Sequence, residues 1–234
     1  MFLNLQYAIG INGSWRKILR HFPRYFYCGA KVRKNVCSDL KKVLVREQPD
    51  VLCLVETYAD HVRGLLDENY TFYDVESKYG IKSFLRKMPG FRRRSNAFLA
   101  RKDLDFQKHF LKNGAKKLIY EMKISEDTGL FMGHFSLFKN IRKRQFTELT
   151  ELARKYKKVI ICGDFNIFSG YKELEFMLES LDLTIVERGG RKTFPSGNPR
   201  LHLDLFLCSR DMEIKEMRVL EDQLSDHLSI ILEI

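Results

Sequence analysis

Paired cysteines are missing from this 234-residue sequence. Its five cysteines are odd in number, and no two of them form a CxxC pair. Neither a zinc site nor a disulfide framework is therefore indicated. Three of the five, Cys53, Cys162 and Cys208, lie inside apolar runs and are typical of core thiols. We expect a reducing compartment, the cytoplasm.

Long apolar runs are also absent. No uninterrupted apolar segment approaches the ~20 residues that a membrane-spanning helix needs. The first residues lack a basic region followed by a long apolar one, so we expect no signal peptide. We find no low-complexity tract, no repeat of solenoid length and no clear linker. We therefore expect a monomer with one domain over residues 1–234.

Acidic residues are in deficit. The chain has 41 Lys+Arg against 30 Asp+Glu, which gives a formal net charge of +11. Such an excess favours polyanionic partners, namely nucleic acid, an anionic membrane or phosphorylated small molecules. The charge does not choose among them, and a basic, solvated surface is the plainer alternative.

A helix followed by a buried strand that ends in a carboxylate is predicted twice. Apolar residues at helical spacing in residues 35–48 precede an apolar run and then Glu56. A second helical face in residues 146–156 precedes another apolar run and then Asp164. Asn166 follows two residues later, so its side chain points the same way as that of Asp164 in an extended chain. A turn or a cap would explain either acid alone, whereas two in matching positions suggest a shared site.

Other polar residues lie at the predicted strands. Asn4 is unusual inside an opening strand because asparagine is poor in strands. His134 lies near a strand end, where a single histidine is more often structural than catalytic. Asp204 lies among alternating apolar residues and would be costly to bury without a partner. Asp226 and His227 precede the closing strand. The other elements that the pattern predicts are a helix at 171–181 and strands at 2–9, 51–55, 70–75, 96–100, 118–124, 130–135, 201–208, 217–220 and 228–234.

Two segments combine positive charge with other signals. Residues 14–34 hold five aromatic residues among basic ones, and Pro23 breaks any single helix through them. This composition suits base stacking or a membrane interface, and equally a flap whose aromatic side chains pack on the core. Residues 91–94 are a charge run that we interpret as a solvated loop.

Taken in order, these fragments resemble the endonuclease/exonuclease/phosphatase superfamily, which includes DNase I, the exonuclease III-type AP endonucleases, neutral sphingomyelinases and inositol polyphosphate 5-phosphatases. The resemblance spans nearly the whole chain. It is carried by Asn4, Pro49-Asp50-Val51-Leu52-Cys53-Leu54-Val55-Glu56-Thr57, Gly133-His134, Arg142-Lys143-Arg144-Gln145, Gly163-Asp164-Phe165-Asn166, Thr193-Phe194-Pro195-Ser196, Leu203-Asp204 and Ser225-Asp226-His227. It implies a four-layered α/β/β/α sandwich, with two mixed sheets face to face and helices outside. It also implies metal-dependent hydrolysis of a phosphoester.

The resemblance also implies roles for individual residues. Glu56 would be the principal ligand of Mg²⁺, for which Mn²⁺ could substitute, with help from Asn4 and Asp226. Asp164 would orient and deprotonate the attacking water, and Asn166 would bind a phosphate oxygen. His227, oriented by Asp204, and His134 would meet the phosphate from other sides. Arg142 and Gln145 match a family pattern that we interpret as structural.

The sequence also departs from the family. Val55 stands where many members carry glutamine, and the chain is near the family's minimum length. His134 matches the DNase-like and sphingomyelinase-like branches, whereas AP endonucleases usually have a tyrosine there. We therefore expect a phosphodiesterase or nuclease. The alternatives are a hydrolase of phospholipid head groups or phosphorylated small molecules, in which residues 14–34 would touch a membrane, and a polyanion-binding module without catalysis.

Overall fold

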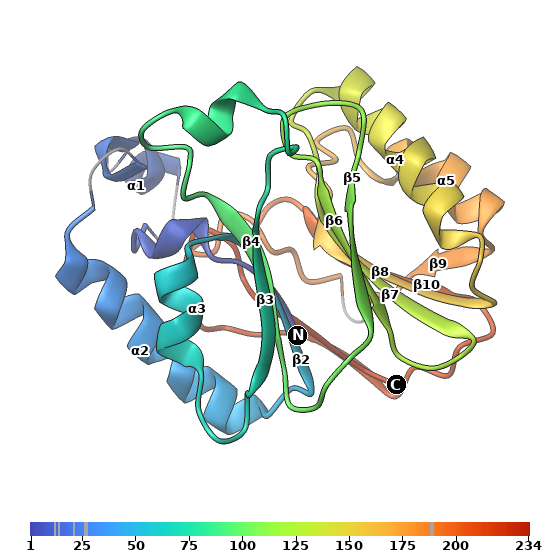
Figure 1. Ribbon diagram of the computed structural model, residues 1–234, viewed down its shortest axis with the longest axis horizontal. Helices are drawn as coiled ribbons and strands as arrows, with labels where there is room; N and C mark the ends of the chain where they lie inside the picture. The colour runs from blue at the N-terminus through green and yellow to red at the C-terminus, as the bar shows by residue number, and fades with distance from the viewer. Residues whose placement is uncertain (12, 14, 21, 26–27, 188–189) are drawn as a thin grey trace.

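The computed structural model describes residues 1–11, 13, 15–20, 22–25, 28–187 and 190–234. Two sheets of six strands pack face to face, and helices cover their outer faces (Figure 1). The predicted four-layered sandwich is therefore confirmed. None of the described helices is long and apolar enough to cross a membrane.

The first sheet has the strand order β11-β12-β1-β2-β4-β3. Its centre is a parallel pair, β1 and β2, and every other pairing in it is antiparallel. Its strands are β1 (Phe2–Asn4), β2 (Val51–Thr57), β3 (Phe72–Ser77), β4 (Ser95–Ala100), β11 (Glu216–Val219) and β12 (Ile230–Glu233).

The second sheet has the order β5-β6-β7-β8-β10-β9 and the same pattern of directions. Its central parallel pair is β7 and β8, with antiparallel neighbours on both sides. Its strands are β5 (Phe106–Phe110), β6 (Leu118–Lys123), β7 (Thr128–His134), β8 (Lys158–Asp164), β9 (Leu183–Ile185) and β10 (Asp204–Ser209). The helix-strand-acid unit predicted twice is thus the centre of each sheet.

Helices connect the parallel strands, as parallel pairing requires. The crossover from β1 to β2 holds α1 (Trp15–Arg20), a 3₁₀ turn η2 (Phe22–Tyr25) and α2 (Ala30–Glu47), whereas α4 (Lys139–Ala153) alone joins β7 to β8. Helices α2 and α3 (Ala59–Leu65) cover the first sheet, and α4 and α5 (Glu175–Ser180) cover the second (Figure 1).

Three apolar layers hold the sandwich together. The middle layer lies between the sheets and includes Phe2, Phe98 and Phe206, together with the core thiols expected from the sequence. The outer layers bury helix faces at the predicted spacing, such as Leu40 of α2 and Leu149 of α4. A fully buried side chain of this size contributes about 1.5–3 kcal/mol.

Several predicted boundaries were wrong. Strand β1 stops at Asn4, because residues 6–8 form the 3₁₀ turn η1 with left-handed backbone angles. Helix α2 starts at Ala30, so residues 30–34 are helix and not part of a flap. Residues 201–203 precede β10 and make only a bridge from Leu201 to Phe194. The short strands β5 and β9 were not predicted. The remaining short turns are η3 (Phe84–Lys87) and η4 (Tyr171–Leu174).

The aromatic residues of the 14–34 segment cannot be compared with their prediction. The side chains of Trp15, Phe22, Tyr25, Phe26 and Tyr27 lie outside the described residues. The charge run at residues 91–94 is described, and its interpretation as a solvated loop was wrong for Arg94. The guanidinium of Arg94 is half-buried and lies over the rings of Tyr7 and Phe91, at 4.8 and 4.6 Å from their centroids.

Candidate active site

The polar residues at the strand ends meet at one edge of the sandwich, which we call the site edge. Asn4 ends β1, His134 ends β7 and Asp164 ends β8. Glu56 is the last residue but one of β2. Because β1 and β2 are parallel, as are β7 and β8, each pair of strands delivers its two side chains at the same edge.

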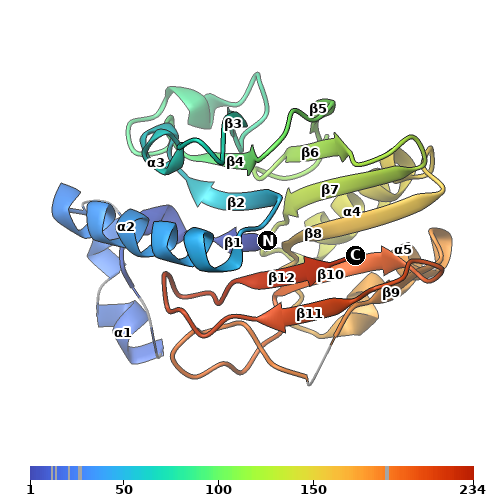
Figure 2. The ribbon, with the colours of Figure 1, turned by 90° about the horizontal axis from the view of Figure 1, so that it is seen from below.

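Antiparallel segments bring the remaining residues to the same place. Asp204 begins β10 and pairs with Asp164 of β8, which in turn pairs with His134 of β7. Asp226 and His227 come just before β12, the antiparallel neighbour of β1 (Figure 2). All eight residues expected from the sequence therefore lie at the site edge, from six strands or their flanks.

Asp164 is the centre of the contact network. Its Oδ2 accepts a hydrogen bond from Asn4 Nδ2 at 3.0 Å and lies 3.2 Å from Nε2 of His134. Its Oδ1 accepts the backbone N–H of Asn166 at 3.1 Å. Although burial opposes it, the histidines His134 and His227 hold the pKa of Asp164 well below its usual range. Asp164 is therefore an anion at neutral pH.

His227 and Asp204 form a buried pair. Nδ1 of His227 lies 2.8 Å from Oδ2 of Asp204, so the carboxylate fixes the ring and its tautomer. Although burial opposes it, Asp204 and then Asp226 raise the pKa of His227 to about 10. The imidazole is therefore protonated at neutral pH. The ring of Phe194 packs against it, with centroids 4.7 Å apart.

Glu56 and Asp226 supply further carboxylate oxygens. Although burial raises it, Lys78 and His134 hold the pKa of Glu56 well below its usual range. Asp226 behaves in the opposite way, because burial raises its pKa to about 7 and the charge of Glu56 adds to the effect. Oδ2 of Asp226 accepts a hydrogen bond from Gln6 Nε2 at 2.7 Å, while Oδ1 is buried with no hydrogen-bond partner among the described residues.

The side chains of the two asparagines form hydrogen bonds with other groups of the protein. Oδ1 of Asn4 accepts the backbone N–H of Gln6, and its Nδ2 contacts both Asp164 and His227. The Nδ2 of Asn166 donates one hydrogen bond to the carbonyl of Phe135 at 3.0 Å, and the role expected for Asn166 at a phosphate oxygen stays a prediction.

Two lysines, Lys78 buried and Lys116 half-buried, complete the site, and sequence reasoning missed both. Nζ of Lys78, directly after β3, lies 2.9 Å from Oε1 of Glu56 and also contacts the hydroxyl of Tyr7. Lys116, just before β6, contacts the ring of His134. Burial and the charge of Lys78 lower the pKa of Lys116 to about 8. Both lysines lie in the stretch where the sequence pattern was weakest, and Lys78 comes three residues after the predicted strand at 70–75.

Backbone strain concentrates at this edge. Among the described residues other than glycine, seven have positive φ, and five of these lie at the site: Gln6, Tyr7, Ala8, Glu56 and Asn166. Left-handed backbone costs roughly 1–3 kcal/mol per residue and persists where the surrounding structure enforces it. This distribution points to a functional site.

The donor set suits a divalent cation. Ligand atoms of Asp164, Asp204 and His227 lie within 4.8 Å of one another, but His227 is protonated and paired with Asp204, so its imidazole does not hold an ion. Oδ1 of Asp226, which has no hydrogen-bond partner among the described residues, and the carboxylate of Glu56 are the hard oxygen donors that Mg²⁺ prefers. The residues present therefore fit such an ion.

The sequence of this chain matches one known protein family. The family described as "Endonuclease/Exonuclease/phosphatase family" matches residues 34–227, which is most of the chain. The chain belongs to this family. Its members are phosphoester hydrolases, so the protein is placed among enzymes of that class. None of the curated proteins compared with the chain matches it.

Solved structures of the family have the same fold. A family protein from Leptotrichia buccalis superposes with a TM-score of 0.68 at 14% identity, covering 90% of this chain and 96% of its own. A mannosyl-6-phosphatase from Bacteroides thetaiotaomicron gives 0.64 at 14% identity, with 99% and 97% covered. D. rerio TDP2 complexed with a single-strand DNA product gives 0.63 at 17% identity, with 85% and 91% covered. At such identities the likeness shows the fold alone.

Proposed function

We propose that this endonuclease/exonuclease/phosphatase family member is an Mg²⁺-dependent phosphodiesterase that acts on nucleic acid. The observation that carries the proposal is the convergence of Asp164, Glu56 and protonated His227 beside two lysines at the site edge. Cleavage of a phosphoester needs a positioned water, a group that takes its proton and positive charge around the phosphoryl oxygens.

Each residue has a role in this mechanism. Glu56 and Asp226, assisted by Asn4, would hold Mg²⁺ or Mn²⁺, which supplies Lewis acidity to the phosphoryl group when bound. Asp164 is charged and orients the attacking water and accepts its proton. His227, held by Asp204, donates its Nε2 proton to the developing charge or to the leaving oxygen.

His134 and the two lysines act on the phosphate. Burial and the charge of Lys116 lower the pKa of His134 to about 4, so the imidazole is neutral and contributes a hydrogen bond without a charge. Its Nδ1 is buried and has no hydrogen-bond partner among the described residues. Lys78 and Lys116 neutralise phosphoryl charge. Asn166 fixes the backbone of the loop that carries Asp164.

Two observations favour nucleic acid as the substrate. The net charge of +11 suits a polyanion and gives no reason to prefer a neutral substrate. A family protein with the same fold, TDP2, has been solved with a single-strand DNA product.

The first test is turnover of bis-p-nitrophenyl phosphate while Mg²⁺ is titrated. We expect Asp164→Asn and His227→Ala each to abolish turnover, by at least about a hundredfold, because each removes a proton-transfer group, while circular dichroism shows folded protein. Glu56→Gln should chiefly raise the Mg²⁺ concentration needed. Near-wild-type rates in all three variants would refute the assignment. No turnover of folded wild type with any divalent ion would favour a binding module.

A second candidate substrate is a phospholipid head group or a phosphorylated small molecule. Large apolar side chains are exposed on loops that leave the site edge, a feature that suits contact with lipid: Ile81, Phe84, Leu137, Phe138 and Phe168. A panel of plasmid DNA, single-stranded RNA, sphingomyelin vesicles and inositol phosphates separates the candidates. Preferred turnover of vesicles over both nucleic acids would favour the lipid.

We further propose that the protein is a one-domain monomer of the cytoplasm. The described cysteines are all free thiols, which suits a reducing compartment. Light scattering coupled to size exclusion tests the oligomeric state, and a dimer mass would contradict it.

A further inference from the structure

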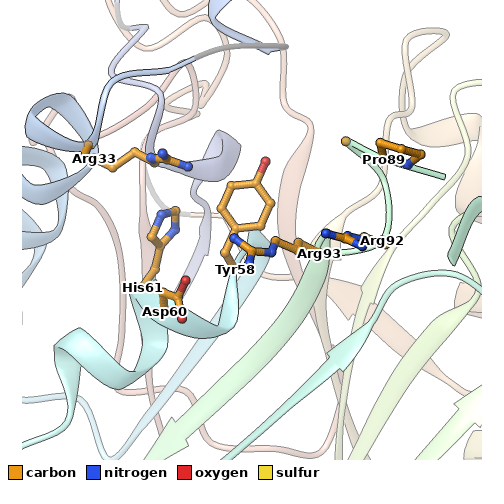
Figure 3. Close-up of a pocket in the computed structure, with 9 residues that line it drawn as sticks. Arg33, Tyr58, Asp60, His61, Pro89, Arg92 and Arg93 are labelled. Atoms are coloured by element: carbon orange, nitrogen blue, oxygen red, sulfur yellow. The ribbon is translucent and has the colours of Figure 1, made fainter. Parts of the chain in front are cut away.

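A second pocket lies beside the candidate active site. It has a volume of about 600 Å³ and is enclosed by the start of α2, by α3 and by the loop that precedes β4. Figure 3 shows Arg33 and Arg93 reaching toward Tyr58 from opposite sides of this pocket, with His61 next to Tyr58 and Arg92 farther along the loop.

Tyrosine rings connect this pocket to the active site. Tyr58 follows Glu56 by two residues, and its ring stacks on that of Tyr7 with centroids 5.2 Å apart. The hydroxyl of Tyr7 donates to Oε1 of Glu56 at 3.3 Å. The pocket therefore lies next to Glu56, with the buried ring of Tyr7 between Tyr58 and that carboxylate.

The pocket has an excess of positive charge. It is lined by three arginines, and within the described residues no ion pair joins Arg33, Arg92 or Arg93 to a carboxylate. The lining carboxylate, Asp60, is exposed and lies 3.7 Å from Arg63. Guanidinium groups in this arrangement match the oxygens of a phosphate.

The first turn of α2 adds to this excess. The 18-residue helix has no acidic residue in its first turn and no side-chain cap at Gly29. Lys31, Arg33 and Lys34 lie instead at this end, where the helix dipole is positive and like charges are unfavourable. An anion bound at this end would accept hydrogen bonds from unpaired backbone N–H groups. Its charge would also offset the repulsion between the basic side chains and the helix dipole.

His61 supplies a buried polar atom. Its side chain is 7% exposed, and its Nδ1 has no hydrogen-bond partner among the described residues. Burial and the charge of Arg33 lower the pKa of this imidazole to about 4, so it is neutral and has a ring N–H to donate. A buried polar group without a partner is costly, and a ligand oxygen would satisfy it.

We propose that this pocket binds a second phosphate group of the substrate, adjacent to the phosphate that is hydrolysed, with Tyr58 packing on the sugar or base between the two. The inference rests on the proposed function and deepens it, because it assigns the substrate class: compounds or strands with two neighbouring phosphates. The second phosphate can come from a nucleic-acid strand or from a free bisphosphorylated small molecule.

The test compares substrates that differ by one phosphate. One arm uses the thymidine dinucleotide TpT with and without a 5′-phosphate, and the other uses glucose 6-phosphate against glucose 1,6-bisphosphate. We expect the additional phosphate to raise kcat/KM about tenfold to a hundredfold in one arm, which identifies the source, because charge-assisted hydrogen bonds have this magnitude.

Variants test the pocket itself. We expect the double substitution Arg33→Ala with Arg93→Ala to reduce the ratio of kcat/KM between paired substrates to near one. The exposed Arg144 on α4 is the control, and Arg144→Ala should retain both the ratio and the basal activity. If the double variant does not fold, Arg92→Gln at an exposed position replaces it and should lower the ratio several-fold.

Failure of the two proposals can be told apart. Wild type that turns over bis-p-nitrophenyl phosphate but gives a ratio near one in both arms would overturn the pocket and leave the proposed function standing. A ratio of kcat/KM between the paired substrates that stays high in the double variant would also overturn the assignment of the pocket. Wild type without any phosphoester turnover would overturn the proposed function.

Discussion

The site edge brings positively and negatively charged side chains close together and away from solvent. Four carboxylates lie there with two lysines and one protonated histidine. Because the surroundings are buried, each charge changes the protonation of its neighbours, as the high pKa of His227 and the low pKa of Asp164 show. Single substitutions should therefore alter cation binding as well as catalysis.

Lys78 is the residue whose removal should tighten metal binding. Its ammonium lies 2.9 Å from Oε1 of Glu56, so it competes with a divalent cation for that carboxylate and repels the ion. We expect Lys78→Met to bind Mg²⁺ at least several-fold more tightly by calorimetry, while turnover falls because phosphoryl charge is less well neutralised. The exposed Lys82 gives the control Lys82→Met, which should leave the affinity unchanged. Weaker binding in Lys78→Met would contradict this interpretation.

His61 should make stability depend on pH. Its pKa is lowered from 6.5 to about 4 by burial and by Arg33 of α2, an effect that Asp60 of its own helix opposes. The unfolded chain therefore takes up the proton more readily. The stabilisation is fully present above about pH 6.5 and is lost as the pH falls toward 4.

Between pH 7.5 and pH 5, protonation of His61 should lower the free energy of unfolding by about 2 kcal/mol. Urea unfolding of wild type and His61→Gln at both pH values measures it. The wild type should lose about 2 kcal/mol more than the variant, and equal losses would contradict the assignment.

At the scale of elements, helix α4 holds the loops that carry site residues. Arg142 Nη1 donates to the carbonyls of Ser136 and Leu137 at 2.8 and 3.0 Å, directly after the strand that ends in His134. Gln145 Nε2 donates to the carbonyl of Lys116 at 2.6 Å. The two residues expected to be structural thus fix the backbone around His134 and Lys116.

Removal of Arg142 should destabilise the protein strongly. The side chain is 1% exposed, and its Nε bonds Glu173 at 3.1 Å. Arg142→Met leaves that carboxylate buried and unpaired, which costs about 3–5 kcal/mol. Chemical unfolding measures the loss, with Arg144→Met as the control. Partial recovery in the double variant Arg142→Met with Glu173→Gln would support the stated cause, and a loss below about 1 kcal/mol would contradict it.

At the scale of the whole molecule, the excess of positive charge should control binding of long substrates. A nucleic acid that contacts several lysines and arginines releases counterions, so its affinity falls steeply with salt. We expect kcat/KM for single-stranded DNA to drop at least about tenfold from 50 to 200 mM NaCl. Turnover of bis-p-nitrophenyl phosphate, with one phosphate, should change little over that range. Equal salt dependence for both substrates would contradict a polyanion-binding surface.

The sequence predicted the family and the central strands because these carry strong patterns. Buried strands such as β2 and β8 are long and apolar, and each carries an acid at or next to its last residue. Strands β5 and β9 were not predicted because they are short, and no residue of β5 is buried. Lys78 and Lys116 were not predicted as site residues for a different reason. A lysine in a polar stretch is ordinary, and only the tertiary fold places it at the site. The left-handed backbone of residues 6–8 has no signal either, since Gln6, Tyr7 and Ala8 rarely adopt it.

The order in which the chain is made has a consequence for when it can act. Asn4 lies in the first strand, whereas His227 precedes the last, and β12 pairs with both β1 and β11. A nascent chain on the ribosome therefore holds Glu56, His134 and Asp164 long before it holds His227, the proposed proton donor. By the proposed mechanism, hydrolysis must wait until residue 227 has emerged.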